Sequence, residues 1–328
     1  MDKRNALEEF YSKNNINHLL VSDKESAEFD NMLFDLDCKI DKWLSYIDES
    51  DREIFCQVLS KYTYLTETAC QKRYEKIVDN LLNHLRSFDI SLDKVLFITV
   101  ESKNGTKSGS EHICADFYKR NRVKGIQKSQ MISSFSRFNI ASIRKYQAIV
   151  FLDDIVGSGF TLSNAIHNVI ETLKDEVDSL STIHLYAACL VLSTRGKRMI
   201  DRNAKKGSYE ITWLIDETYY AQKMFKTNST EYEVFEKYEY LIDDYINDNK
   251  SYFMGFEKGK LGISFHYNTP NNTLSTFWCE TDINKPPFKR DGDQPQKRLK
   301  INDLKQIKQQ TDYNAYNAAI AREPEHEC

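Results

Sequence analysis

The sequence predicts an α/β fold: a domain built on a mostly parallel sheet, preceded by a helical region and followed by a hood segment and a polar tail. Three observations support this prediction. Short β-branched and aromatic runs recur from residue 95 onwards, helical spacing separates two of them, and apolar residues before residue 90 step by three and four. We expect the helical region at 1–90, the α/β domain at 91–285 and the tail at 286–328.

The amino-terminal region has the periodicity of amphipathic helices. Between residues 26 and 48 one apolar stripe is formed by Phe29, Leu33, Leu36, Ile40, Trp43, Leu44 and Ile47. Residues 52–86 continue in the same manner. We therefore interpret residues 1–88 as a helical cap or a small helical domain.

Four buried strands are expected after this region, at 95–100, 148–152, 182–192 and 209–215. Between the second and the third, helical spacing connects Leu162, Ile166, Val169, Ile170, Leu173 and Val177. A strand, a helix and a strand at this spacing form a βαβ unit, which predicts parallel strands covered by helices.

The composition and periodicity of the sequence change again in the remainder of the chain. Residues 230–250 are acidic and aromatic with helical spacing, and 261–278 contain two strand-like pieces around an Asn-Thr-Pro-Asn-Asn turn. After residue 285 the sequence is polar, with one helix expected near 300–322.

Composition excludes several classes of protein. The 328 residues are 41% hydrophobic, which suffices for packed cores, and the net charge of −4 gives no general sign of nucleic acid or an anionic membrane. We find no apolar run of about 18 residues and no secretory signal, so a cytoplasmic protein without a membrane span is expected. The seven cysteines never form CxxC and the seven histidines lack HExxH spacing, which argues against disulfides, zinc sites and metal hydrolases.

The stretch "AIVFLDDIVGSGFTL", residues 148–162, concentrates the candidate chemistry. Asp153 and Asp154 follow the second strand, and ligands of open α/β sheets bind at the carboxyl ends of the strands. Gly157, Ser158 and Gly159 then lead into a helix that starts near Phe160, so backbone N–H groups and a helix N-terminus face one small volume. Ser158 and Thr161 add hydroxyl donors, and the loop is suited to a phosphate group.

Two common phosphate motifs do not fit this loop. No lysine follows either glycine as in a Walker loop, and Leu162 occupies the third glycine position of a dinucleotide fingerprint. Carboxylates repel phosphate, so the two aspartates must bind another part of the same ligand, and vicinal hydroxyls are suitable donors to them. The implied ligand is a ribose 5-phosphate group.

The segment "FLDDIVGSGFT" resembles the signature of type I phosphoribosyltransferases, in which two acidic residues end a strand and Ser/Thr-Gly-x-Thr follows. The match covers Asp153, Asp154, Ser158, Gly159 and Thr161, with Phe160 where many members carry glycine. The resemblance implies that the aspartates bind the ribose hydroxyls of 5-phosphoribosyl diphosphate and that residues 157–161 bind its 5-phosphate. The alternative is an acidic turn that merely caps a helix.

The same family binds the diphosphate on a loop after an earlier strand, and "VESKNG", residues 100–105, has that place. Ser102, Lys103 and Gly105 are then candidates, and a solvated charged turn is the alternative. The resemblance also implies Mg²⁺, held indirectly by Asp153 and Asp154 through ribose and diphosphate oxygens.

A second resemblance is narrower. "GISFHYNTPNNTLSTFW" and the later "PPFKR" are similar to a carboxy-terminal signature of phosphoribosyltransferase-like proteins of bacterial conflict systems, including retrons, where they are thought to act as effectors. Here Tyr267 interrupts the His-Asn pair and Ser275 replaces a proline. His266 and Trp278 could form a wall facing a base, and a turn over an aromatic core is the alternative.

Two basic stretches have both a functional and a structural interpretation. Residues 107–125 could close over a diphosphate or form a plain amphipathic helix with Ile113 and Phe117 inward. "STRGKR", residues 193–198, could bind phosphate or a polynucleotide or begin a solvated helix.

These interpretations lead to an anti-phage effector that binds 5-phosphoribosyl diphosphate with Mg²⁺ and transfers or destroys its phosphoribosyl group, toxic when a partner complex releases it. The alternatives are a non-catalytic sensor of a phosphoribosyl ligand and an effector nuclease. The partners implied are a reverse transcriptase, its nucleic acid or a DNA-binding subunit, and self-association into a homo-oligomer. The sequence identifies no acceptor.

Overall fold

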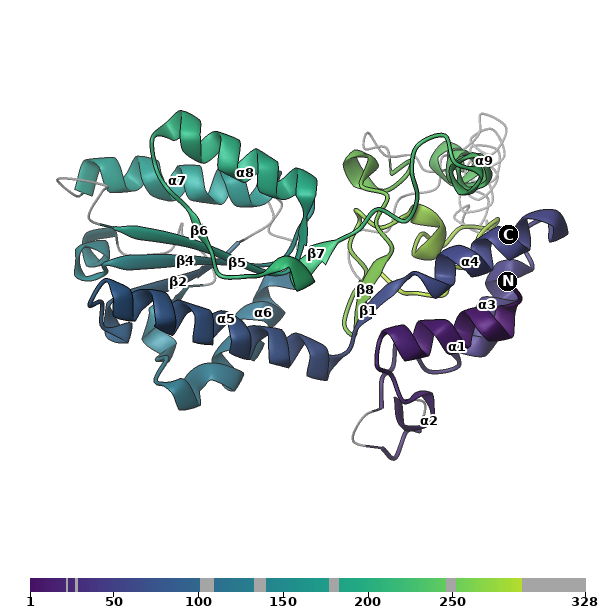
Figure 1. The fold of residues 1–328 in the computed structure, drawn as a ribbon, viewed down its shortest axis with the longest axis horizontal. Coiled ribbons are helices and arrows are strands. Elements are labelled where there is room, and N and C mark those ends of the chain that lie inside the picture. The colour runs from purple at the N-terminus through teal and green to yellow at the C-terminus, as the bar shows by residue number, and fades with distance from the viewer. Residues whose placement is uncertain are drawn as a thin grey trace, which may run out of the picture.

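The computed structural model describes residues 1–21, 23–26, 29–100, 109–132, 140–176, 183–245 and 252–290. These residues form two lobes that lie side by side (Figure 1). One lobe contains the large sheet between two layers of helices, and the other contains the amino-terminal helices together with the last part of the described chain. The long helix α5, Glu67–Ser87, leads from the second lobe into the first.

The expected parallel sheet is confirmed. Its strands have the order β3-β2-β4-β5-β6, with β7 beside β5, and all of these pairings are parallel. The central strand β4 lies between β2 and β5. The strands are β2 (Val95–Thr99), β3 (Met131–Ile132), β4 (Ala148–Val156), β5 (His184–Ser193), β6 (Thr212–Trp213) and β7 (Tyr220–Ala221).

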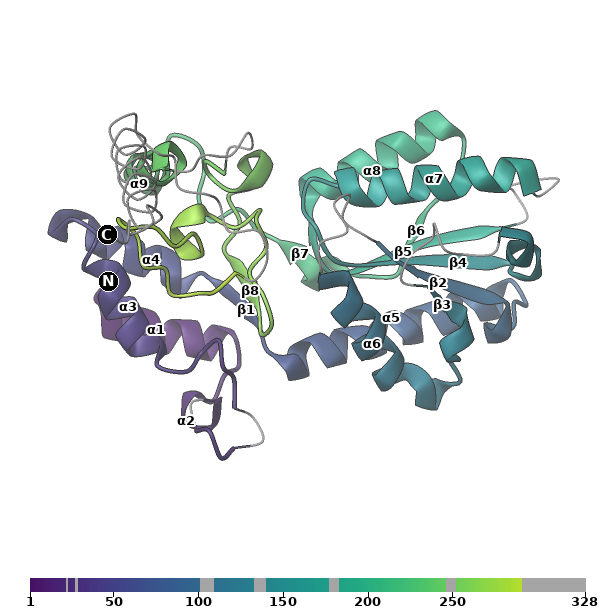
Figure 2. The ribbon, with the colours of Figure 1, turned by 180° about the vertical axis from the view of Figure 1, so that it is seen from behind.

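Helices cover both faces of this sheet. α5 and α6, Gly109–Asn121, lie on one face, and α7, Phe160–Glu176, and α8, Thr194–Gly207, lie on the other (Figures 1 and 2). The first face buries Tyr74, Phe97 and Phe117, and the second buries Phe151 and Ile166. The β4–α7–β5 unit is therefore the βαβ unit that the periodicity predicts.

The second lobe joins the two ends of the described chain in one apolar core. Residues 6–64 and 224–288 contribute to it, and the Trp43 Nε1–H donates to the Thr276 carbonyl at 3.0 Å. The Tyr62 and Phe288 rings stack with centroids 4.5 Å apart. Two short strands, β1 and β8, pair in parallel within this lobe. Its elements are α1 (Lys3–Lys13), α2 (His18–Val21), α3 (Leu36–Leu44), α4 (Arg52–Ser60), β1 (Thr63–Leu65), α9 (Thr230–Tyr245) and β8 (Ile263–Phe265).

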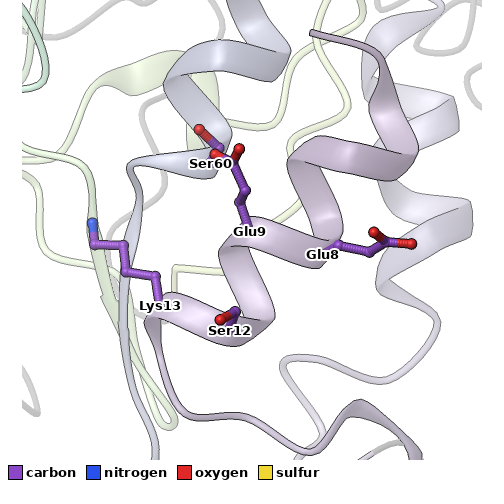
Figure 3. Close-up of a pocket in the computed structure, with 5 residues that line it drawn as sticks. All are labelled: Glu8, Glu9, Ser12, Lys13 and Ser60. Carbon is purple, nitrogen blue, oxygen red and sulfur yellow. The ribbon is translucent and has the colours of Figure 1, made fainter.

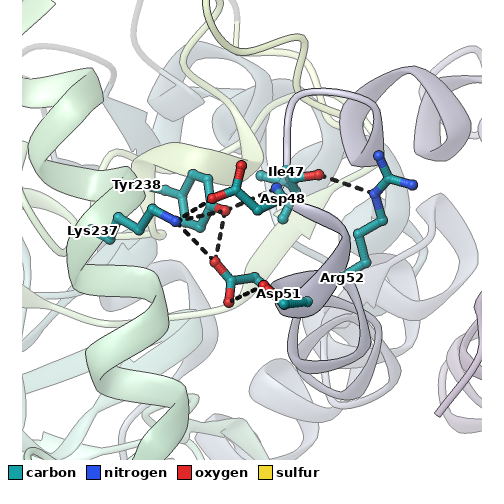
Figure 4. Close-up of polar contacts among 7 residues, drawn as sticks. Ile47, Asp48, Asp51, Arg52, Lys237 and Tyr238 are labelled. Carbon is teal, nitrogen blue, oxygen red and sulfur yellow. Dashed lines mark hydrogen bonds and ion pairs between the residues drawn. The ribbon is translucent and has the colours of Figure 1, made fainter.

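A polar cluster attaches α9 to the turn before α4 (Figure 4). The Lys237 ammonium bonds to the carboxylates of Asp48 and Asp51, and the Tyr238 hydroxyl donates to Asp51 Oδ2 at 2.8 Å. The hydrogen bond from Lys237 lowers the pKa of Asp48. Residues far apart in the sequence are thus fixed side by side.

Short 3₁₀ helices make up many of the connections in the described ranges, and all but one of them have a single turn. They are Glu49–Asp51, Leu92–Lys94, Arg122–Lys124, Lys128–Gln130, Ile140–Lys145, Glu217–Tyr219, Phe256–Lys258 and Ser275–Phe277.

Several expected elements differ from the structure. The helix expected from residue 26 begins at Leu36, because Asp35 has a φ of 54°, outside the helical region. Residues 63–65, interpreted as helical, form β1 because they pair with β8. The strand expected at 209–215 is reduced to β6, and the second strand-like piece of 261–278 is a 3₁₀ helix. The helix expected near 300–322 lies outside the described residues.

Candidate functional site

The two aspartates lie at the carboxyl end of the central strand. β4 was expected to end at Leu152, but it continues to Val156, so Asp153 and Asp154 belong to the strand itself. The ladder to β5 runs through the Asp153–Cys189 pair and resumes at Ile155–Val191. The longer strand follows from β5, which is buried along nearly its whole length and offers continued pairing.

Both carboxylates are half-buried and bonded to backbone. Asp153 Oδ1 accepts from the Asp154 N–H at 2.9 Å, and Asp154 Oδ1 accepts from the Ile155 N–H at 2.7 Å. Burial raises the pKa of Asp153 well above its ordinary value, and the charge of Asp154 adds to the rise. Burial also raises the pKa of Asp154, against the Ile155 N–H and the charge of Arg290, which lower it. The pair therefore favours a ligand that brings hydroxyl donors or positive charge.

The glycine loop after β4 leads directly into α7. Gly159 has a φ of 82°, and a Cβ atom there would lie 2.8 Å from the Gly196 carbonyl oxygen. Ser158 Oγ accepts from the Phe160 N–H at 3.3 Å. α7 has 17 residues, and the positive end of its dipole lies at its N-terminus beside the loop, where it favours negative charge. Phe160, which is 48% exposed, and Thr161, which is also exposed, lie at this end of the helix. The sequence-predicted loop residues 157–161 are thus brought together.

The start of α8 supports this loop from the β5 side. The Ser193 hydroxyl bonds to the Gly157 carbonyl, and its oxygen accepts from the Gly196 N–H at 2.8 Å. A Cβ atom on Gly196 would lie 2.5 Å from the Val156 carbonyl oxygen. Glycine at this position therefore allows α8 to pack against the loop.

Three residues of the carboxy-terminal signature lie next to the aspartates and the loop. The Tyr267 hydroxyl donates to Asp154 Oδ2 at 3.5 Å, the outer limit of a hydrogen bond. The charge of Arg290 lowers the pKa of Asp154, and its guanidinium donates to the Thr269 carbonyl at 2.6 Å. Asn272 packs on Gly157, where a Cβ atom would lie 2.5 Å from the Asn272 Cγ. We call residues 261–290 the hood.

A cavity of about 420 Å³ adjoins the loop between the two lobes. It is lined by Gly157 and Ser158, by residues 193–195 at the start of α8, by residues 220–223 and 256–259, and by Leu261 and Asn272. Within this lining the Arg195 guanidinium pairs with the Glu257 carboxylate at 2.5 Å. Asp153 and Asp154 are not part of its lining.

The remaining candidate site residues, which were identified from the sequence, lie in different parts of the chain. Ser102 and Lys103, with Gly105, lie outside the described residues. The stretch 107–125 contains α6, whose Ile113 and Phe117 are buried as an amphipathic helix requires. "STRGKR" begins α8. Trp278 is 1% exposed and donates to the Thr273 carbonyl, so it belongs to the core and does not face a base.

The site contains residues whose roles the sequence did not reveal. In the sequence, Tyr267 stands out only because it interrupts the His-Asn pair of the carboxy-terminal signature. Arg290 stands out only as the last residue of "PPFKR". Ser193 and Gly196 are marked in the sequence only as part of the basic stretch "STRGKR", because their support of the glycine loop depends on contacts with a neighbouring strand.

A second hollow lies between α1 and α4 (Figure 3). Glu8, Glu9, Ser12, Lys13 and Ser60 line it, and burial lowers the pKa of Lys13, which bonds to the Lys61 carbonyl. It is far from β4 in both ribbon views and presents no recognisable catalytic set.

Within the described ranges no group of three or more His, Cys, Asp or Glu side chains could hold a metal ion. Of the helices that these ranges contain, none has the length and apolar character needed to cross a membrane.

The comparisons with known proteins give one family. A model of the family PRTase-CE matches residues 40–290. The match includes β4, the glycine loop and the whole hood. No curated protein matches the chain.

Proposed function

The chain belongs to the PRTase-CE family of phosphoribosyltransferase-like conflict effectors, and from this premise we propose that it binds 5-phosphoribosyl diphosphate and breaks the C1–O bond of the sugar. Asp153 and Asp154 bind the ribose hydroxyls, and residues 157–161 bind the 5-phosphate. The observation that supports this proposal best is the continuous run of two carboxylates, a glycine loop and a helix N-terminus at the end of the central strand.

Charge explains why the aspartates bind the hydroxyls of the ligand and the loop binds its phosphate. Burial raises the pKa of both aspartates, and the charge of Asp154 raises the pKa of Asp153 further. Hydroxyl donors from a ligand would stabilise the ionised carboxylates. Phosphate is repelled by these carboxylates and is favoured by the loop, where backbone N–H groups and the α7 dipole carry positive charge. One ligand with hydroxyls at one end and a phosphate at the other satisfies both parts.

The donor set also fits Mg²⁺ that arrives with the ligand. Two neighbouring carboxylates offer oxygen atoms, and the described part of the chain offers no group of three acidic, Cys or His side chains that would hold the ion alone. We propose that Asp153 and Asp154 hold Mg²⁺ through the ribose and diphosphate oxygens. The ion supplies charge neutralisation when the diphosphate leaves.

The proposed reaction breaks one bond at C1 of the sugar and forms another. The C1–O bond breaks with its electron pair on the departing diphosphate, and a nucleophile forms the new bond to C1. With water as nucleophile the products are ribose 5-phosphate and diphosphate, and with another acceptor they are its phosphoribosyl derivative and diphosphate. From the hood, the Tyr267 hydroxyl donates to Asp154 Oδ2, and the charge of Arg290 favours the ionised form of the carboxylate that orients the sugar.

The biological setting is part of the proposal. We propose that this chain is a toxic effector of a retron-type anti-phage system in the cytoplasm, restrained by a complex with a reverse transcriptase, its nucleic acid or a DNA-binding subunit, and capable of forming a homo-oligomer. The genes beside its own test this setting directly.

Phosphorus NMR of 5-phosphoribosyl diphosphate, MgCl₂ and the full chain tests the chemistry. We expect the diphosphoryl resonances of the substrate to decay and those of free diphosphate to appear. Broadened resonances without consumption would favour the non-catalytic sensor instead. Unchanged spectra, with neither broadening nor turnover, would contradict the proposal.

A further inference from the structure

Helix α8 carries a dense row of positive charges on its solvent side. Six of its 14 residues are Lys or Arg and one is Asp, in a chain with a net charge of −4. Its buried residues, Gly196, Ile200 and Ala204, face the sheet. At about 100° per residue, five cations fall within an arc of roughly 100° on the opposite side. We call them the α8 stripe: Arg195, Arg198, Arg202, Lys205 and Lys206.

Within the part of the chain that the structure describes, carboxylates do not neutralise most of the stripe. Asp201, the acid of α8, bonds to Lys197 at 2.5 Å and to the Trp213 Nε1–H at 3.0 Å, on the flank of the helix. Arg195 pairs with Glu257. The other four stripe residues have no ion pair with any carboxylate of the described chain. Like charges at this spacing repel one another, so the stripe favours a ligand with several negative charges.

The stripe leads into the cavity beside the glycine loop. α8 begins at the wall of that cavity, where Arg195 lies, and Lys223 and Lys258 add two further cations to the lining. The same lining includes the aromatic residues Tyr220 and Phe256. Cations in a row together with aromatic rings are the combination that binds single-stranded nucleic acid, because phosphates pair with the cations and bases stack on the rings.

We propose that the α8 stripe and this cavity form one surface for single-stranded nucleic acid, with backbone phosphates along the stripe and one nucleotide in the cavity. From residue 195 to 206 the helix rises by about 16 Å, so the stripe is long enough to contact several consecutive phosphates of one strand. The cavity shares Gly157 and Ser158 with the loop proposed for the 5-phosphate, so a nucleotide bound there would compete with 5-phosphoribosyl diphosphate. The stripe itself lies outside that loop and the aspartate pair, so binding along it does not require 5-phosphoribosyl diphosphate.

An anionic membrane fits the stripe less well. Helices that bind membranes insert large apolar side chains beside their cations. In α8, Ile200 and Ala204 are buried and Met199 is partly buried, and the helix contributes none of the large, exposed apolar residues of the described chain. Three of the five stripe residues are Arg, whose planar guanidinium suits phosphate oxygens.

Fluorescence anisotropy with a labelled 20-nucleotide single strand, DNA and RNA in turn, tests the proposal on the full chain. The triple variant Arg198→Glu/Arg202→Glu/Lys205→Glu reverses the stripe. Its matched control, Lys72→Glu/Arg86→Glu/Lys119→Glu, makes the same change in charge on exposed residues of α5 and α6, across the sheet. Circular dichroism verifies that both variants are folded, and glutamine at the same three stripe positions provides a milder second variant.

We expect the stripe variant to lose more than about ten-fold in affinity and the control to lose less than about two-fold. Removing three phosphate contacts should reduce the slope of log K against log salt by about 2. Tyr220→Ala should weaken binding by about ten-fold without changing that slope, because stacking releases no counterions. Equal losses in stripe and control variants, no binding by the unmodified chain, or stripe-dependent binding to phosphatidylserine vesicles without binding to the oligonucleotides would each overturn the proposal.

Discussion

The carboxamide of Asn272 lies against the α-carbon of Gly157, where a Cβ atom would come within 2.5 Å of the Asn272 Cγ. This contact joins the hood to the glycine loop. Asn272 is nearly buried and its Nδ2 donates to the Phe256 carbonyl at 3.2 Å, so it has little room to move.

Gly157→Ala tests this contact. The new methyl group displaces the Asn272 carboxamide, which loses its bond to Phe256, and we expect a loss of about 1–3 kcal/mol in the free energy of unfolding and weaker ligand binding. Adding Asn272→Ala removes the clash and should recover part of both. Urea denaturation and calorimetry of the two single variants and the double variant measure the coupling; strictly additive effects would contradict the contact.

Asp153→Asn should stabilise the ligand-free protein at neutral pH. The folded state holds the pKa of Asp153 well above its ordinary value, so between the two pKa values the folded protein binds more protons than the unfolded protein. Stability is therefore lost as pH rises through that interval, and the neutral amide avoids the loss.

Thermal unfolding from pH 4 to 8 measures this effect as the difference in Tm between variant and unmodified chain. The difference should grow with pH and then level off. Asp89→Asn is the matched control, because Asp89 is exposed and its φ of 54° is one that Asn adopts readily. A constant difference, or one that shrinks with pH, would show that Asp153 is not strained by its charge.

Arg290→Met should shift the acidic limb of ligand binding to higher pH. Arg290 lowers the pKa of Asp154 by its charge, and methionine keeps the apolar part of the side chain while removing that charge. Arg290→Lys keeps the charge and should leave the limb nearly in place. The affinity for 5-phosphoribosyl diphosphate with Mg²⁺, measured at several pH values, shows where binding weakens on the acidic side for each protein. If binding weakens at the same pH in all three proteins, Arg290 does not act on the ligand site.

Glu239→Ala should destabilise the second lobe. The buried carboxylate of Glu239 accepts from the Met254 N–H at 2.9 Å, the Ser275 hydroxyl at 2.7 Å and the Thr276 N–H at 2.9 Å. Truncation leaves these donors unsatisfied, so we expect a loss of about 2–4 kcal/mol in urea denaturation. Glu233→Ala, exposed on the same helix, should lose only a few tenths. Similar losses in both variants would contradict the role of Glu239 in holding the hood.

Asp153→Asn/Asp154→Asn should relieve growth arrest in cells that express the chain without its partners. The prediction follows from the proposed sugar site, since a toxic reaction needs the sugar oriented. Growth curves at equal protein abundance measure the effect, with Asp89→Asn as the variant that stays toxic. Arrest that persists in the double variant would locate the toxicity elsewhere on the surface.

The sequence predicts those helices and strands that can be recognised from the pattern of their own residues. Helical spacing identifies α7 and α9, apolar runs identify β2, β4 and β5, and the residue types around Asp153 and Gly157 indicate the loop. The pairing of β1 with β8 and the length of β4 depend on partner strands, so the local pattern does not contain them. The approach of Tyr267, Asn272 and Arg290 to the loop likewise depends on how the two lobes pack, and motif spacing only marks those residues as worth attention.

Isothermal titration calorimetry with 5-phosphoribosyl diphosphate and MgCl₂ tests the central claim most directly. The unmodified chain and Asp89→Asn should bind with the same affinity, EDTA should weaken binding, and Asp153→Asn/Asp154→Asn should weaken it by more than about ten-fold through the loss of charge-assisted bonds to the ribose hydroxyls. Equal binding by the unmodified chain and the double variant, or no heat of binding from the unmodified chain, would contradict a sugar-phosphate site at the end of β4.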